Sequence, residues 1–115
     1  METKQEIRAY LLANLDKYTV WTDVRELIAV WSRNPIVWSW GFHNPTIYND
    51  KVLGFNVNGH LHKGKVFLAV NGSDLFEIYF TSHKGEIMQV QKDVYLEDLT
   101  TTIDNVVEKI PQYKY

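Results

Sequence analysis

The sequence predicts an α+β fold with two N-terminal helices, a four- to five-stranded antiparallel β-meander and a C-terminal helix. Between residues 52 and 90, apolar residues alternate with period two, the spacing that sends successive side chains to opposite faces of a sheet. Before and after this stretch, apolar residues recur at helical spacing instead. The 115 residues are expected to form a single domain, 1–115, that folds without disulfides or metal ions.

The first predicted helix spans about residues 4 to 18. Thr3 and Glu6 have the spacing of a capping box, in which a hydroxyl and a carboxylate satisfy free backbone N–H groups at a helix start. Apolar residues then follow on one helical face, at Ile7, Leu11, Leu15 and Tyr18.

A second helix is predicted at about residues 23 to 33. Thr22 is its candidate N-cap, and Asn34-Pro35 must end it because proline disfavours a helical conformation in the preceding residue. The apolar face of this helix comprises Val24, Leu27, Ile28 and Trp31. The alternative is a strand at residues 18 to 21, where the residue types favour strands.

After Pro35, the sequence predicts an extended segment that places Trp38, Trp40 and Phe42 on one face and ends before Pro45. This segment is a candidate edge strand. Two interpretations of the aromatic stripe are open. It either presents a rigid apolar surface to a partner or seals the end of the core beneath the second helix.

Turn signals set a register for the central meander. A two-residue turn at residues 63–64 brings Val57 opposite Val70, and two further loops continue the pattern. The predicted pairs on the buried face are Val57 with Val70, Leu68 with Ile78 and Phe80 with Met88. The same register assigns to this face Leu53, Phe55, Leu61, Val66, Phe76 and Val90. A shift of one residue in the last loop would instead turn Gln89 and Gln91 toward the core.

The C-terminal helix is predicted from its apolar spacing, and Pro111 should end it. Its apolar residues are Leu99, Ile103, Val106 and Ile110. We expect this helix to cover the apolar face of the sheet.

Composition excludes several functional classes. The sequence has no cysteine, which excludes disulfides, thiolate zinc sites and cysteine nucleophiles. Its formal net charge of -2 disfavours duplex nucleic acid as a partner, because that binding depends on neutralising many phosphates. The N-terminal residues lack the pattern of a signal peptide, and no segment reaches membrane-spanning length. We therefore expect a cytoplasmic protein that has no membrane partner.

The sheet face opposite the predicted core is a candidate binding surface. Its predicted cross-strand rows are His60, Phe67, Tyr79 and Gln89, and beside them Asn58, Ala69, Glu77 and Gln91. If this face is open, its aromatic rings and polar groups form a recognition surface. We favour the alternative, in which helices cover the face and Phe67 and Tyr79 are packing residues, because three helices suffice to protect both faces.

The histidines do not assemble an evident catalytic or metal site. His60 and His62 lie two apart on one predicted strand, but protein metal sites normally use three or four ligands. Glu77 lies two strands from His60, about 10 Å away and too far for a hydrogen-bonded acid–base pair. His43 and His83 are candidate bases without a predicted partner. We expect neither an enzyme nor a metal site, and no cofactor, since no phosphate-binding glycine loop is present.

The leading functional prediction is a non-enzymatic interaction protein that binds or blocks another protein, or a second copy of itself, through its aromatic-rich sheet surface. Four Trp, seven Tyr and five Phe exceed what a modest core requires, and surplus aromatics commonly anchor partners. The alternative is a module that binds a small molecule or single-stranded nucleic acid through the polar and aromatic sheet face. The expected contact residues are Trp38, Trp40, Phe42, Asn58, His60, Phe67, Glu77 and Tyr79.

Three observations separate these classes. A concave pocket lined by aromatic side chains favours a ligand binder, and an exposed apolar patch without a deep pocket favours a protein binder. Converging titratable groups would favour the third candidate, a hydrolase or metal enzyme centred on the histidines.

Overall fold

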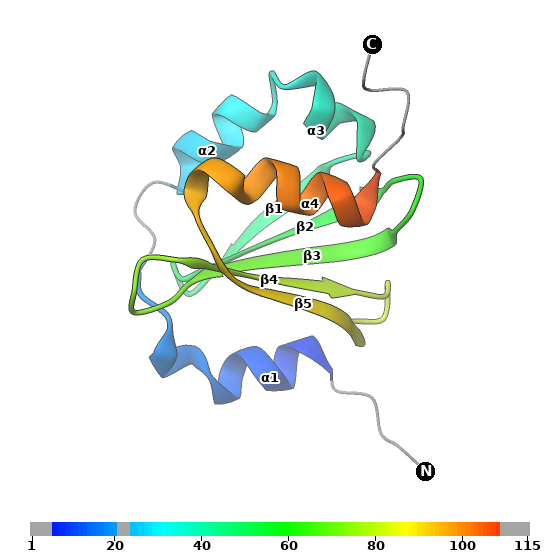
Figure 1. The fold of residues 1–115 in the computed structure, drawn as a ribbon. Helices are drawn as coiled ribbons and strands as arrows, with labels where there is room; N and C mark the ends of the chain where they lie inside the picture. The colour runs from blue at the N-terminus through cyan, green and yellow to red at the C-terminus, as the bar shows by residue number, and fades with distance from the viewer. Residues whose placement is uncertain (1–5, 21–23, 109–115) are drawn as a thin grey trace.

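The computed structural model describes residues 6–20 and 24–108, which form an α+β fold around a five-stranded antiparallel sheet (Figure 1). The strands are β1 (His43–Tyr48), β2 (Val52–Asn58), β3 (Lys63–Val70), β4 (Phe76–Thr81) and β5 (Ile87–Val94), paired in chain order as a meander. The helices are α1 (Ile7–Ala13), α2 (Val24–Trp31), α3 (Pro35–Ser39) and α4 (Leu99–Val107), with 3-10 turns η1 (Leu15–Lys17) and η2 (Leu96–Asp98). The predicted fold class is confirmed, and α3 is an additional short helix.

α1 begins later than the helix predicted at residues 4 to 18, because Glu6 caps it, and it ends earlier, at Ala13. The Glu6 carboxylate accepts hydrogen bonds from the backbone N–H groups of Arg8 (3.0 Å) and Ala9 (3.2 Å). These bonds satisfy donors that have no partner inside the helix, so the helix begins at the next residue after the cap. The predicted capping residue Thr3 lies outside the described residues. A separate 3-10 turn, η1, follows α1.

α2 lies at the position predicted for the second helix. Its inner side buries Val24 and Trp31, as the apolar spacing predicts. The expected N-cap, Thr22, lies outside the described residues. The alternative strand is not formed in residues 18–20, where the structure has one isolated bridge, between Tyr18 and Asn71.

The segment predicted to be extended forms the helix α3 instead. The Asn34 side chain accepts a hydrogen bond from the N–H two residues later (2.9 Å). Pro35 occupies the first turn, where its fixed φ suits a helix and its missing N–H removes no hydrogen bond. Helical spacing then separates the aromatic side chains: Trp38 is 62% exposed, Trp40 is fully buried and Phe42 is half-buried. The predicted continuous aromatic stripe is therefore wrong.

The β2–β3 hairpin has a different register from the predicted one. Val57 lies opposite Gly64, whereas the prediction placed it opposite Val70, six positions further along β3. Because a slip of six is even, every side chain that lies in β2 or β3 keeps its predicted face of the sheet. Gly64 belongs to the strand, and a Cβ there would lie 2.2 Å from the carbonyl oxygen of Thr81. This glycine therefore permits a close approach to β4 and does not mark the turn.

The actual β2–β3 connection is a loop, residues 59–62, that α4 holds in place. The N–H groups of Leu61 and His62 both donate to the carbonyl of Val107, at 2.8 and 3.1 Å. Gly59 packs so closely that a Cβ there would lie 2.4 Å from the Val107 side chain. Leu61 is 57% exposed, so its predicted place in the core is wrong.

The remaining two hairpins agree with the prediction in part. Leu68 lies opposite Ile78 as predicted. Phe80 lies opposite Gln89, one residue beyond the predicted partner Met88, because the register shifts next to Phe80. The sheet tolerates a glutamine on this face because β5 is an edge strand. Met88 and Val90 are exposed and are not core residues.

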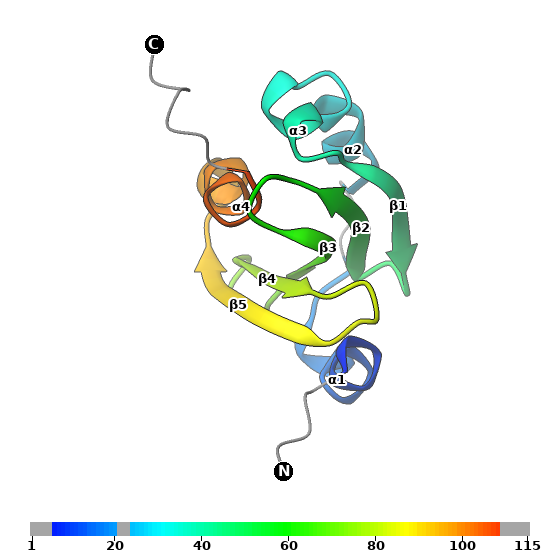
Figure 2. The same ribbon diagram turned by 90° about the vertical axis from the view of Figure 1, so that its right-hand side faces the viewer.

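Helices cover both faces of the sheet: α2, α3 and α4 lie on one side and α1 on the other (Figures 1 and 2). The larger core, under α2 to α4, includes Leu53, Phe55, Val57, Val66, Leu68, Ile78, Phe80, Leu99, Ile103 and Val107. The smaller core, under α1, consists of Ile7, Leu11, Tyr18, Val52, Phe67, Ala69 and Tyr79. The predicted packing of the C-terminal helix on the apolar face is confirmed. Ile110 and Pro111 lie outside the described residues.

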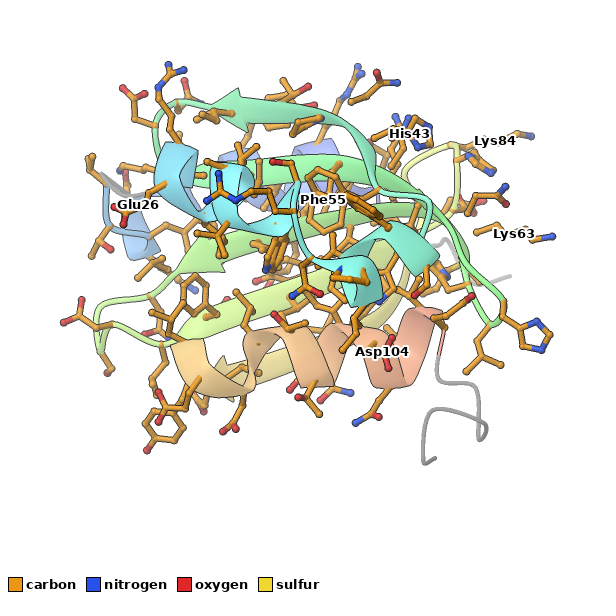
Figure 3. The ribbon with its side chains drawn as sticks, turned by 90° about the horizontal axis from the view of Figure 1, so that it is seen from above. Glu26, His43, Phe55, Lys63, Lys84 and Asp104 are labelled. Carbon is orange, nitrogen blue, oxygen red and sulfur yellow. The ribbon has the colours of Figure 1, made fainter. Side chains whose placement is uncertain are left out.

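Two of the tryptophans are core residues whose indole N–H groups bond to α4. Trp40 donates to the carboxylate of Asp104 (2.9 Å) and Trp31 to the hydroxyl of Thr100 (3.3 Å). The Trp31 ring makes an edge-on contact with Phe55, with ring centroids 5.7 Å apart. Figure 3 looks onto this helical layer and labels Phe55 on β2 and Asp104 on α4. Burial of an indole is favourable when its N–H has a partner, as here.

Candidate functional site

A groove of about 540 Å³ lies between α1 and the sheet. Its apolar walls come from two sides. The helical wall consists of Ile7, Leu11, Leu12 and Leu15, and the sheet wall of Tyr48, Val52 and Phe67. Most of these side chains belong to the smaller core or pack against it, so the groove is an unfilled continuation of that core. Leu12 is 69% exposed, which makes it the accessible lip of the groove.

The sheet wall depends on a glycine. The rings of Tyr48 on β1 and Phe67 on β3 lie 6.1 Å apart, on either side of Gly54 on the intervening strand. A Cβ at Gly54 would lie 2.7 Å from the Phe67 ring and 2.9 Å from the Tyr48 ring. Only a residue without a side chain lets both rings occupy these positions.

The groove has an apolar end and a cationic end. α1 starts beside the β4–β5 turn, where the N–H of Ile7 donates to the carbonyl of Gly85 (2.7 Å). It runs toward the β1–β2 turn, where the ammonium of Lys51 donates to the carbonyl of Leu15 (3.2 Å). The groove residues near the start of α1 are Glu6, Arg8, Lys65, His83 and Lys84, and those toward its end are Leu11, Leu12, Leu15, Tyr48, Asn49 and Val52.

Behind the groove, a chain of buried hydroxyl groups fastens the 3-10 turn η1 to the sheet. The hydroxyls of Tyr18 and Tyr79 lie 2.8 Å apart, and Tyr79 donates to the carboxylate of Glu77 at 2.5 Å. Burial raises the pKa of Tyr18 to about 12. Burial and the bond to Glu77 raise the pKa of Tyr79 further above its ordinary value. Both phenols are therefore neutral at physiological pH and act as structural groups.

The predicted sheet-face surface is only partly reproduced. Phe67 lies opposite Tyr79, and Ala69 opposite Glu77, as predicted. Gly54 and Val52 replace the predicted members of these rows from β2, His60 and Asn58, because of the slipped register, and Val90 replaces Gln89 next to Tyr79. α1 covers the rows, so Phe67 and Tyr79 are buried. Of the predicted contact residues on this face, Phe67 alone lines the groove.

The other predicted contact residues lie apart from the groove. Asn58 ends β2, and its N–H donates to the Trp40 carbonyl (2.7 Å). His60 is exposed in the β2–β3 loop, and its N–H donates to the carboxylate of Glu108. Phe42 packs on Phe55, with ring centroids 4.8 Å apart. These contacts hold loops and helices to the sheet.

His62, the neighbour of His60, packs edge-on against Phe80, with ring centroids 5.9 Å apart. Burial lowers its pKa below the ordinary histidine value. Within residues 6–20 and 24–108, no three His, Asp or Glu side chains lie close enough together to hold a metal ion. No helix in this part of the chain is long and apolar enough to cross a membrane.

Sequence reasoning did not single out Arg8, Leu12, Lys65 or Lys84 as site residues. One signal was present in the first helix, where Leu12 beside Leu11 widens the apolar stripe beyond what one packed face requires. A second was Lys65, which alternates onto the same sheet face as Phe67. The groove itself depends on where α1 lies across the sheet, which no local pattern specifies.

Comparisons with protein-family models, with curated proteins and with solved structures find no match to this chain.

Proposed function

We propose that this protein is a non-enzymatic binding module that holds a small, largely apolar molecule in the groove between α1 and the sheet. The observation that supports this proposal is the groove, whose volume of about 540 Å³ falls within the range of about 300 to 1,000 Å³ typical of ligand pockets. Its leucine and aromatic walls match the usual lining of such pockets. The cytoplasm is the location we propose.

Binding without catalysis is favoured by the charged groups at the groove. The carboxylate of Glu6 is engaged by two backbone N–H groups at the start of α1, which leaves it poorly suited to act as a base. The other charged side chains that line the groove include the guanidinium of Arg8 and the ammonium groups of Lys65 and Lys84. Such groups position a ligand more readily than they transfer protons from it.

The test is binding of the neutral solvatochromic dye Nile red to the purified protein. A Leu12→Asp variant should bind the dye at least about tenfold more weakly, because a carboxylate at the lip opposes entry of an apolar molecule. Leu96→Asp is the matched control, since Leu96 is 62% exposed and does not line the groove. Equal dye binding by the wild type and both variants would contradict the proposal.

A second candidate function is capture of a protein partner, which was the leading prediction from the sequence, but through α3 in place of the predicted sheet surface. Trp38 supports it, because an anchor must be reachable before a partner arrives. This side chain is 62% exposed, and its indole N–H donates to the carbonyl of Ser32 (2.7 Å), so the ring is held in place while open to solvent. Ile36 on the same helix is also exposed.

This candidate predicts that Trp38→Ala loses a partner that the wild-type protein retains in pull-downs from its native host. Leu96→Asp, which changes a distant apolar side chain of similar exposure, should retain that partner. Recovery of the same proteins by wild type and Trp38→Ala would count against α3 as a docking element.

A further inference from the structure

We infer that the ligand of the groove is a single-chain amphipathic carboxylate, with its anionic group at the start of α1 and its apolar chain directed toward Leu15. The inference rests on the proposed ligand-binding function and adds the chemical class and orientation of the ligand. Three observations carry it: the cationic lining residues gather at one end, the carboxylate of Glu6 there already accepts hydrogen bonds, and the rest of the lining is apolar except for Asn49.

The cationic end carries an excess of positive charge in a protein whose formal net charge is -2. Arg8, Lys65 and Lys84 line the groove there, and His83 lies beside them. Among the described residues, the acidic side chain that lines the groove is Glu6, whose carboxylate accepts two backbone hydrogen bonds from α1. An anion at this end therefore meets cationic side chains on three elements, namely α1, β3 and the β4–β5 turn, and none of them has an ion pair within residues 6–20 and 24–108. Charge-assisted hydrogen bonds to a carboxylate are among the stronger polar contacts in proteins.

The strand positions and the β4–β5 turn place two of these cations at the same end of the sheet. Lys65 lies opposite Asn56 and Thr81 in the ladder and two residues before Phe67, so its side chain leaves the same face as that groove-lining ring. Lys84 lies in the β4–β5 turn, next to the glycine whose carbonyl binds α1. Figure 3 shows Lys84 at the end of the sheet where β1 begins at His43. The cations therefore meet at one mouth of the groove and are not spread along it.

The length of the apolar part of the groove sets the length of the hydrocarbon chain that the ligand can have. From Arg8 to Leu15, which covers most of α1 and the first residue of η1, this wall of the groove advances about 10 Å, at about 1.5 Å per residue. An extended backbone advances about 3.3 to 3.6 Å over three bonds, so this distance holds a chain of about eight bonds. Leu11, Leu12, Val52 and Tyr48 line this stretch. A medium-chain carboxylate matches both the length and the polarity of the groove.

The experiment measures binding of decanoate, decan-1-ol and decyltrimethylammonium to the full chain by calorimetry, each below its micellar concentration, with amide chemical shifts to locate the site. We expect decanoate to bind about tenfold or more tightly than the alcohol, the equivalent of one charge-assisted contact. The ammonium compound should bind most weakly. Shifts should centre on residues of α1 and on Val52.

Charge variants separate the class of ligand from the existence of the site. The double variant Lys65→Gln, Lys84→Gln should bind decanoate about as weakly as decanol. The control Lys63→Gln, Lys92→Gln removes two exposed lysines that do not line the groove, and it should keep the preference for decanoate. Equal binding of decanoate and decanol by the wild type would overturn the inferred class and leave the proposed groove function standing.

Two other outcomes would also overturn the inferred class of ligand. If none of the three probes binds at the groove, the inferred class and the proposed function both fail. Binding to phosphatidylglycerol vesicles without binding to free decanoate would also overturn the inference, since the cations would then serve a membrane surface and not a single-chain ligand.

Discussion

At the scale of single residues, two glycines and one histidine show how backbone and burial constrain this protein. Gly64 lets β3 approach β4, and Gly54 lets two aromatic rings share the sheet wall of the groove. His62 lies against Phe80, and its Nε2 is buried without a hydrogen-bond partner in the described part of the chain.

We predict that Gly54→Ala lowers the free energy of unfolding by about 1 to 3 kcal/mol, the range typical of overpacking. Its methyl group would lie 2.7 Å from the ring of Phe67, so that ring must move. Gly72→Ala is the control, because a Cβ at Gly72 has no heavy atom within 4 Å. Urea denaturation of both variants is the measurement, and equal stabilities would contradict the proposed role of Gly54.

For His62, the prediction concerns pH. Burial lowers its folded-state pKa below the unfolded value of 6.5, so the unfolded chain binds more protons between those two values. The free energy of unfolding should therefore fall as pH decreases through about 6.5. His62→Gln should reduce this dependence between pH 8 and pH 5, whereas His60→Gln, at an exposed histidine two residues earlier, should retain it. An unchanged pH profile in His62→Gln would refute the assignment.

At the scale of elements, α3 shows why one aromatic segment has two different roles. A helix started by Asn34 and Pro35 rotates successive side chains by about 100°, which sends Trp38 to solvent and Trp40 into the core. The alternating order of these aromatics matched an extended segment, but the cap and the proline at the first turn outweighed it. The spacing of apolar residues in a short helix can thus resemble the spacing of a strand, even where the residues at its start favour a helix.

The two tryptophans therefore give a matched pair of variants. Trp40→Ala should cost about 3 to 5 kcal/mol of folding free energy, as expected for removal of a large buried ring. Trp38→Ala should lower the free energy of unfolding by less than about 1 kcal/mol, because most of the Trp38 ring already contacts water. The variant loses only the one hydrogen bond that the indole N–H makes to Ser32. Chemical denaturation decides between these values. Similar losses in both variants would mean that Trp38 is a packing residue.

At the scale of the whole molecule, the sheet separates two cores of unequal size. The larger core holds α2, α3 and α4 to one face, and its composition was predictable because β2, β3 and β4 alternate cleanly and the helical stripes at 24–31 and 99–107 are strong. The groove was not predictable, because it arises from the path of α1 across the second face. The β2–β3 register was misjudged because Lys63-Gly64 resembles a two-residue turn, while the real loop needs contacts from α4.

A pair of leucine variants tests the observed register. Leu68 is fully buried in the larger core, so Leu68→Asp should unfold the protein, because a carboxylate there has no partner. Leu61→Asp should remain folded, since Leu61 lies exposed in the loop although the turn-based register placed it in the same core. Circular dichroism and thermal melting distinguish the outcomes. An unfolded Leu61→Asp protein would show that the observed register is wrong, and a folded Leu68→Asp protein would show that Leu68 is not a core residue.

The bond between the β2–β3 loop and α4 also has a consequence for the order of folding. The acceptor for Leu61 and His62 is the carbonyl of Val107, so it is synthesised 46 residues after Leu61. Until then the nascent hairpin lacks this acceptor, and the competing register at Lys63-Gly64 preserves the same apolar face. Contacts so distant in sequence form late and slow the folding of a chain. We therefore expect the hairpin to exchange between registers on the ribosome and to become fixed only after α4 has emerged.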